Sequence, residues 1–294
     1  MGDYESIEDI VLRHSGRGMN LLRRYIERDY IAAAARGLLR QRRGNVLLAT
    51  GFYVNGIGET DGPPGTVVLA EALRRLGFTP AVLTDECCRG FFEDQGLAVE
   101  YMDLTGGPEE VGRVLSSWQP SAMIAIERCG VNIRDDYENM RGISIKSHTA
   151  PVDQVFEEAR RLGIFTIGIG DGGNEIGMGC LREKIRKYLD IVPCRVDTDA
   201  LIIASVSNWG AYGLTAQLES LTGMQLMMPW EEVAAFLSEI TKRGSVDGVL
   251  GRPACSVDGF GIETEREILC ALDELVSRGQ AGKGSEITCP SIQN

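Results

Sequence analysis

Short apolar runs alternate with amphipathic segments along most of this chain. Six runs rich in aliphatic and β-branched side chains are predicted as strands, at residues 45–50, 80–84, 98–102, 121–126, 164–169 and 200–205. The stretches between and after them are predicted as helices, near residues 66–76, 87–95, 108–117, 151–162, 208–222, 230–243 and 260–277. Because strands that alternate with helices pair in parallel, this pattern predicts an α/β fold with a mostly parallel, doubly wound, Rossmann-like sheet flanked by helices.

The same pattern divides the chain. Residues 1–40 are predicted as a helical N-terminal arm or cap, with apolar side chains at spacings of three and four. Residues 41–277 are predicted as one α/β catalytic domain, and residues 278–294, which lack periodicity, as a flexible tail. Three strand segments are apolar throughout, as expected where helices cover both faces of a central strand: Val46–Ala49, Met123–Ile126 and Leu201–Ala204.

Composition narrows the class of protein. The 294 residues carry 42 acidic and 30 basic side chains, a formal net charge of −12, which argues against binding to nucleic acid or to an anionic membrane and favours a cationic ligand or a metal ion. No apolar run reaches the roughly 18–20 residues of a spanning helix, and the first residues are acidic where a signal peptide would be basic. We therefore expect a soluble, cytoplasmic protein, and an exposed N-terminal helix would suit a homo-oligomer.

Cysteine and histidine content limits the chemistry. The eight cysteines form no CxxC pair and are expected to be mostly buried, reduced thiols. Cys129, beside a charged pair, is a minor candidate for a catalytic thiol against ordinary packing. His14 and His148 are the only histidines, which excludes a multi-histidine metal site.

A glycine- and carboxylate-rich run, Gly168–Gly179, directly follows a predicted strand. Ligands of open α/β sheets bind outside the carboxyl ends of strands, so this run marks a candidate active site. Within it, Asp171 and Glu175 flank Gly172-Gly173-Asn174, and carboxylate and amide oxygens suit Mg²⁺ or Mn²⁺. In the alternative interpretation, Asp171 and Asn174 only cap a helix.

A second strand-end loop leads into the predicted helix at 66–76. Thr66 can cap that helix, and its free N–H groups could hold a carboxylate or phosphate. The glycine spacing matches a dinucleotide fingerprint only loosely, so neither a nicotinamide nor a flavin cofactor is expected. A plain turn-rich loop is the alternative. The candidate ligand-binding residues of this loop are Thr60, Asp61, Gly62, Gly65 and Thr66.

A third group follows the predicted strand at 121–126. Glu127 could handle protons or metal while Arg128 holds a carboxylate, or the two could form a surface ion pair. Farther along the same loop, Lys146 could neutralise a substrate carboxylate and His148 could relay protons, or both could be surface residues near a helix start. Asn132 is a further candidate for substrate binding.

Later loops add weaker candidates. After the strand at 200–205, Asn208 can cap a helix and Trp209 can wall a pocket, or both can be structural. Asp247 and Asp258 lie in glycine-containing loops and are candidates for the rim of a pocket, with solvated turns as the alternative.

Several of these segments together resemble the D-glutamate cyclase family, over about residues 20–275. The segments that carry the resemblance are Gly51-Phe52, Glu59–Gly65, Glu127–Gly130, Ile145–Thr149 and Gly168–Gly179. The resemblance implies a lyase that dehydrates D-glutamate to 5-oxo-D-proline and water, with an amino acid as the small-molecule partner.

The residues suit that implied reaction. A carboxylate is a poor electrophile, and a divalent ion on Asp171 and Glu175, with Glu127, could polarise the γ-carboxyl group. Glu127 or His148 could take the amine proton. Arg128 and Lys146 could fix the α-carboxylate, together with the free N–H groups at the helix start around Gly65 and Thr66. The residues expected to bind substrate are Thr60, Asp61, Gly62, Gly65, Thr66, Arg128, Asn132, Lys146, Gly172, Gly173 and Asn174.

Two other functions remain open at this point. A metal-dependent phosphatase or nucleotide-handling enzyme would use the same glycine loops and acids, although the chain has no GxxxxGK[ST] motif. A noncatalytic sensor could bind a small molecule at the same place, and substrate turnover would distinguish it from an enzyme.

Overall fold

A six-stranded parallel sheet forms the centre of the protein. The computed structural model describes residues 5–284. The strands lie in the order β5-β4-β1-β6-β7-β8, which is the order 3-2-1-4-5-6 of the Rossmann fold when these six are counted along the chain. This confirms the predicted α/β class. The bounds are β1 Asn45–Thr50, β4 Thr79–Thr84, β5 Ala98–Tyr101, β6 Ala122–Ile126, β7 Phe165–Gly170 and β8 Ala200–Ile203.

The central strands are buried on both faces. β1 pairs with β4 on one side and β6 on the other, with Leu48 in register with Val82 and Ile124. All five residues of β6 are buried. Helices therefore cover both faces of the sheet, as the uninterrupted apolar runs predict.

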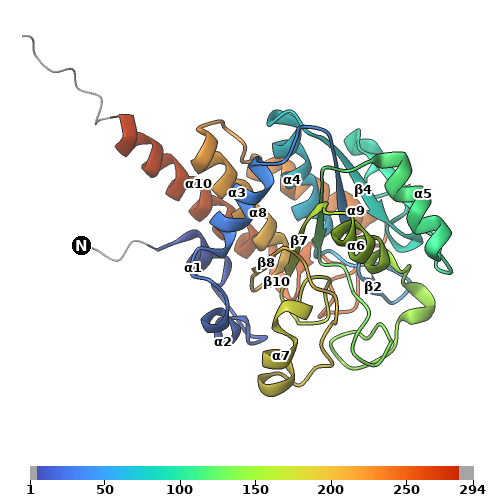
Figure 1. Cartoon of the computed structure of the whole chain (residues 1–294). Helices are drawn as coiled ribbons and strands as arrows, with labels where there is room; N and C mark the ends of the chain where they lie inside the picture. Colours follow the sequence, from blue (N-terminus) through green and yellow to red (C-terminus); the bar gives the residue numbers. More distant parts are fainter. Residues whose placement is uncertain (1–4, 285–294) are drawn as a thin grey trace, which may run out of the picture.

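The helices form unequal layers (Figure 1). Helices α5 and α6 lie together on one face, while α4 and α3 both pack against α8 on the other face, with α10 and α9 outside them. Their bounds are α3 Tyr30–Leu39, α4 Pro63–Arg75, α5 Pro108–Trp118, α6 Val152–Arg161, α7 Arg182–Tyr188, α8 Ser207–Thr222, α9 Trp230–Lys242 and α10 Ile262–Gly284. The central α8 is buried along most of its length because helices surround it.

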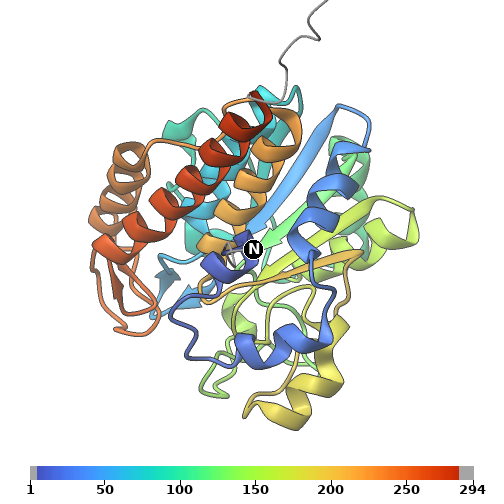
Figure 2. The ribbon, with the colours of Figure 1, turned by 90° about the vertical axis from the view of Figure 1, so that its left-hand side faces the viewer.

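The N-terminal segment is built into this layer. Two short helices, α1 (Ile7–Val11) and α2 (Met19–Leu22), precede α3, and a 3-10 turn, η1 (Arg23–Tyr25), links α2 to it. A capping box between Ser6 and Asp9 starts α1. Figure 2 shows this blue segment running beside α8 and α10, and α1 contacts both of those helices. Its apolar side chains therefore belong to the main core.

Several small elements differ from the sequence-based prediction. The helix predicted at 87–95 consists of two 3-10 turns, η2 (Glu86–Cys88) and η3 (Glu93–Gln95). Two further 3-10 turns, η4 (Lys146–His148) and η5 (Gly179–Leu181), lie in the loops after β6 and β7. Two hairpins also form: β2 (Tyr53–Val54) with β3 (Ile57–Gly58), and β9 (Ser256–Val257) with β10 (Phe260–Gly261).

The C-terminal helix is longer than predicted. α10 continues to Gly284, so residues 278–284, predicted as tail, are helical. The remainder of that predicted tail, 285–294, lies outside the described residues. Within residues 5–284, none of the helices has the length and apolar character needed to cross a membrane.

Candidate active site

A cavity of about 320 Å³ opens at the carboxyl edge of the sheet. Loops after β1, β6 and β7 line it, together with the loop of residues 244–259. The strand order reverses between β1 and β6, so the cavity lies at the topological switch point where α/β folds bind ligands. Its volume is at the lower end for small-molecule sites.

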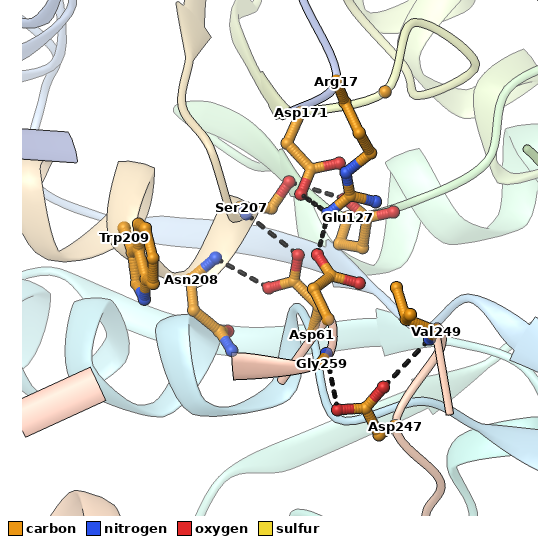
Figure 3. Close-up of polar contacts among 12 residues, drawn as sticks. Arg17, Asp61, Glu127, Asp171, Ser207, Asn208, Trp209, Asp247, Val249 and Gly259 are labelled. Carbon is orange, nitrogen blue, oxygen red and sulfur yellow. Dashed lines mark hydrogen bonds and ion pairs between the residues drawn. The ribbon is translucent and has the colours of Figure 1, made fainter. Parts of the chain in front are cut away.

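Arg17 is the cation at the inner end of the cavity. Its Nη2 donates to Asp171 Oδ2 at 2.7 Å and also pairs with Asp258 Oδ2. Figure 3 shows Arg17 reaching across Asp171, with Glu127 and Asp61 gathered on the same side. The guanidinium comes from the N-terminal segment between α1 and α2, so that segment supplies a residue of the site.

Glu127 follows β6 directly and has a strained backbone. Its φ is +45°, in the left-handed region that a residue with a side chain seldom adopts. The Ser207 hydroxyl at the start of α8 donates to Glu127 Oε2 at 2.6 Å. Burial raises the pKa of Glu127 well above its ordinary value, and the charge of Glu175 adds to this. This carboxyl group is therefore unusually basic.

Asp61 faces the N-terminus of α8. It accepts hydrogen bonds from the backbone N–H groups of Ser207 at 2.9 Å and Asn208 at 2.8 Å. These donors favour the carboxylate, but burial dominates and, with the charge of Asp258, raises the pKa of Asp61 to about 7. Asp61 therefore titrates near neutral pH.

Asp171 is the most poorly satisfied of these carboxyl groups. Only 1% of its surface is exposed, and its Oδ1 is buried without a hydrogen-bond partner among the described residues. Burial raises the pKa of Asp171 well above its ordinary value against the opposing effect of Arg17. An unpartnered buried oxygen is costly, which favours a bound proton or cation at this atom.

The glycine-rich loop after β7 wraps around Glu175. The Glu175 carboxylate accepts backbone hydrogen bonds from Gly172 at 2.6 Å and Gly173 at 2.7 Å. A β-carbon at Gly170 or Gly172 would crowd that carboxylate. The glycines therefore allow the loop to close around the carboxylate, and no helix begins at Asp171 for it to cap.

Two groups of three carboxylates could hold a metal ion. Glu127, Asp171 and Glu175 form one group, and Asp61, Asp171 and Asp258 form the other. In each, one oxygen per residue lies within 4.8 Å of the others. Such all-oxygen sets suit Mg²⁺ or Mn²⁺. The first group contains the three residues that the sequence predicts as metal ligands.

Asp258 and a second carboxylate reach the cavity from loops on its far side. Asp258 and Gly259 form the two-residue turn between β9 and β10, both with positive φ, as Asp-Gly hairpin turns require. Buried Asp247 holds this loop by accepting from the Ser256 hydroxyl and from three backbone N–H groups. Glu59 packs so closely on Gly248 that a β-carbon there would overlap its carboxylate. Asp258 thus lines the cavity at its inner end, paired with Arg17, and is neither a rim residue nor part of a solvated turn. Asp247 is a structural support.

The outer rim is partly aromatic and apolar. The rings of Tyr53 and His148 stack with centroids 4.3 Å apart, which joins the β2–β3 hairpin to the loop after β6. Met140 and Ile143 line the cavity and are exposed. His148 therefore lies at the mouth of the cavity, while the carboxylates lie at its inner end.

Three predicted substrate-binding residues have other partners. Arg128 is fully buried and donates to Asp85 at 2.5 Å and to the carbonyl groups of Gly51 and Ala150. Lys146 is exposed and donates to the Asp135 carbonyl. Asn132 accepts from the backbone of its own loop. None of the three lines the cavity.

The N-terminus of α4 is already occupied. The N–H groups of Gly62 and Gly65 both donate to the side-chain oxygen of Asn208, at 2.9 and 2.8 Å. Asn208 thus satisfies the groups that the sequence suggests for a ligand carboxylate. The Thr66 hydroxyl donates to Gly62 and the Thr60 hydroxyl to Ser256, so neither points at the cavity.

Other side chains settle the alternatives left by the sequence. Trp209 is buried and donates to Glu265 at 2.6 Å, so its role is structural. Cys129 is buried, and burial raises its thiol pKa well above the ordinary value, as in an ordinary packed cysteine. Asn174 lines the cavity while its amide donates to the Glu138 carbonyl at 2.8 Å.

Sequence reasoning missed Arg17 and Glu59 as site residues. Arg17 is remote from every strand end, and no spacing links it to Asp171. Glu59 follows Asn55-Gly56, whose positive φ values mark a tight hairpin. Asn-Gly between β-forming residues was the available signal for that hairpin.

The fold and cavity define an α/β protein with an acidic cavity at the switch point of its sheet. Residues 7–273 match the family described as D-glutamate cyclase-like, C-terminal, and the chain belongs to this family. The human mitochondrial D-glutamate cyclase is 32% identical over 216 residues, which cover 65% of this chain and 35% of the human protein. The match thus spans about a third of that relative.

Solved structures resemble the fold more distantly. An exopolyphosphatase-related protein from Bacteroides fragilis aligns with 86% of this chain and 60% of its own, with a TM-score of 0.40 and 9% identity. The tRNA N6-threonylcarbamoyladenosine dehydratase of E. coli, in complex with AMP, aligns with 71% of this chain and 96% of its own, with a TM-score of 0.28 and 12% identity. These likenesses do not extend to function.

Proposed function

We propose that this protein is a D-glutamate cyclase, a carbon–oxygen lyase that converts D-glutamate to 5-oxo-D-proline and water. Family membership supports this reaction. The observation that carries the proposal is the buried carboxylate cluster around Asp171, whose Oδ1 has no hydrogen-bond partner among the described residues. Glu127, Glu175 and Asp258 of this cluster line the cavity of about 320 Å³. Such a cluster binds cations and moves protons, and the reaction needs both.

The proton balance of the reaction suits Glu127. Ring closure forms a bond between the substrate nitrogen and the γ-carbon, and one γ-carboxylate oxygen leaves. Two protons leave the ammonium group and depart with that oxygen as water. The elevated pKa of Glu127 brings its basicity closer to that of an amine. Glu127 is therefore better suited than rim residue His148 to accept and return a proton.

The cluster also suits a divalent cation. Asp171, Glu175 and Glu127 would hold it, and bound Mg²⁺ or Mn²⁺ would polarise the γ-carboxylate and stabilise the developing oxyanion. Without a bound cation or proton, these carboxylates would repel an anionic substrate. The raised pKa values of Glu127 and Asp171 reflect the same repulsion among neighbouring negative charges, added to the dominant effect of burial.

The rim supplies a group for the α-carboxylate. Arg141 lines the cavity, and its guanidinium forms no ion pair within residues 5–284. Asn139 accepts from the backbone N–H groups of Arg141 and Ile143, which fixes the turn that carries this arginine. Arg141 at the mouth and cation-binding carboxylates inside would orient a molecule with a carboxylate at each end.

The decisive experiment follows loss of primary amine from D-glutamate with added Mg²⁺ or Mn²⁺. We expect turnover with D-glutamate, a much slower reaction with L-glutamate, and a lower rate after chelation. Asp171→Ala should lower kcat at least about 100-fold, as for loss of an essential electrostatic group, with an unchanged circular dichroism spectrum. Glu183→Gln, at an exposed carboxylate on α7, is the matched control. No amine loss from D-glutamate, or full activity in Asp171→Ala, would refute the proposal.

A further inference from the structure

Arg17 lies between carboxylates contributed by widely separated parts of the chain. Its Nη2 donates to Asp171 at the end of β7 and pairs with Asp258 in the β9–β10 turn. Burial alone would lower the pKa of Arg17, but the charges of Asp171, Asp258, Glu127 and Asp61 raise it well above the ordinary value. Arg17 is therefore a permanent positive charge within this cluster.

The surroundings of Arg17 carry more acid than this single guanidinium balances. Within the described residues, six carboxyl groups surround or adjoin Arg17. They are Glu59, Asp61, Glu127, Asp171, Glu175 and Asp258. Buried carboxylates without balancing cations are strongly unfavourable. This excess of carboxyl groups would be stabilised by positive charge in addition to that of Arg17.

The contacts of Arg17 divide the two metal-binding groups. They share Asp171, and Arg17 already bridges Asp171 and Asp258 in the group completed by Asp61. In the other group, Glu127 and Glu175 make no hydrogen bond to the guanidinium, so that only Asp171 contacts it. Arg17 uses Oδ2 of Asp171, while the buried Oδ1 is unpartnered. One group is therefore filled by an arginine and the other retains a free ligand atom.

We propose that the cluster is a two-cation site in which Arg17 permanently fills the position between Asp171 and Asp258, and a divalent metal ion fills the position at Glu127, Asp171 and Glu175. The second position rests on the cation binding in the proposed function. Arg17 thereby limits the protein to one metal ion per chain. Its role is to position Asp171 and balance its charge, since a side-chain guanidinium cannot dissociate from the protein as a bound ion does and stays protonated.

Removal of the arginine charge should open the first position. In Arg17→Met, Asp61, Asp171 and Asp258 would face one another without a cation. Three converging carboxylate oxygens then offer a second site to a hard divalent ion. Arg17→Lys retains one positive charge and should keep that site closed.

The experiment counts Mn²⁺ ions bound to chelator-treated full-length protein, from the loss of the free Mn²⁺ electron paramagnetic resonance signal. We expect about one ion per chain in the wild type and in Arg17→Lys, and about two in Arg17→Met. Arg13→Met is the matched control, because Arg13 lies in the same segment but pairs with Glu5 and Glu267. It should bind about one ion.

Equal stoichiometry in the wild type and in folded Arg17→Met would overturn the inference. So would two ions in the wild type, because the ion would then displace the guanidinium. If Arg17→Met does not fold, Asp258→Asn and Asp171→Asn decide the matter. The inference expects Asp171→Asn to lose the ion and Asp258→Asn to bind it within about threefold of wild type, since only Asp171 is its ligand. Loss of the ion in both variants would contradict it.

The amine-loss assay separates this inference from the cyclase proposal. A change from one ion to two without D-glutamate turnover would support the cation arrangement and refute the cyclase. Turnover of D-glutamate with one ion in both the wild type and Arg17→Met would support the cyclase and refute the cation arrangement.

Discussion

At the residue scale, burial outweighs hydrogen bonding in setting the pKa of one acid that does not line the cavity, Glu265. Glu265 on α10 is 1% exposed and accepts from Trp209 at 2.6 Å and Tyr212 at 3.2 Å. These donors favour the carboxylate, yet burial raises its pKa to about 8. The protein therefore keeps a neutral acid between α8 and α10 at physiological pH.

This shift makes stability depend on pH in a defined direction. An unfolded glutamate titrates near 4.5, whereas folded Glu265 titrates near 8. Its stabilising contribution is complete below the unfolded pKa and is lost as pH rises through the folded pKa. Glu265→Gln, which stays neutral, should therefore gain stability relative to wild type by a few kcal/mol, on the order of 1.4 per pKa unit, between pH 5 and 9.

Urea unfolding at several pH values measures this difference. Glu274→Gln on the same helix is the control, because Glu274 is exposed and pairs only with Arg278. Its difference from wild type should stay within about 0.5 kcal/mol across the range. A difference for Glu265→Gln that does not change with pH would show that the folded carboxyl group titrates normally.

At the scale of elements, the hairpins and glycine loops determine how closely the carboxylates approach. The β9–β10 turn directs Asp258 toward Arg17, and Asp247 anchors its loop. Glu59 approaches the same loop at Gly248. These loops have little regular structure. Hydrogen bonds to Asp247 hold the loop that carries Asp258, and Gly248 lets the Glu59 side chain pack closely against it.

Gly248→Ala tests this close packing. The added methyl group would overlap the Glu59 carboxylate and force that side chain or the loop to move. We expect a loss of about 1–3 kcal/mol of unfolding free energy, measured by thermal and urea denaturation. In Gly261→Ala, on the following strand, the new methyl group meets open space. Equal stability of the two variants would contradict the packing.

The elements themselves were largely predictable, but the site was only partly so. All six sheet strands start and end within two residues of their predicted bounds, because apolar runs between helices mark buried strands. The strand-end rule also located Glu127, Asp171 and Glu175. It could not exclude Arg128 as a substrate-binding residue, since only the fold shows that the Arg128 guanidinium pairs with buried Asp85.

At the scale of the whole molecule, the N-terminal segment is part of the main α/β unit. Its buried side chains include Ile7, Ile10, Val11 and Ile31, which join the main hydrophobic core. Gly213 on α8 has no side chain where Val11 and Ile7 pack. Periodicity predicted the helices, but it could not show that α8 would be their partner.

Deletion of residues 1–40 should therefore destroy the fold rather than release a smaller domain. Exposing these buried side chains costs about 1.5–3 kcal/mol for each large one, which together exceeds ordinary stability. We expect residues 41–294 to lack a cooperative thermal transition by circular dichroism. Ile10→Ala in the full chain, a milder change, should keep the transition and lose about 2–5 kcal/mol. A cooperative transition in the deletion variant would mean that the segment is separable.

The pairing of Arg17 with Asp258 also has a consequence for how the chain matures. These residues are 241 positions apart, so their contact encloses most of the protein. Loops this long close late, because chain entropy opposes the encounter until shorter-range contacts have formed. During synthesis the cavity therefore stays incomplete until the last hairpin has left the ribosome. A partly made chain would hold Arg17 and the earlier carboxylates of the cluster without Asp258.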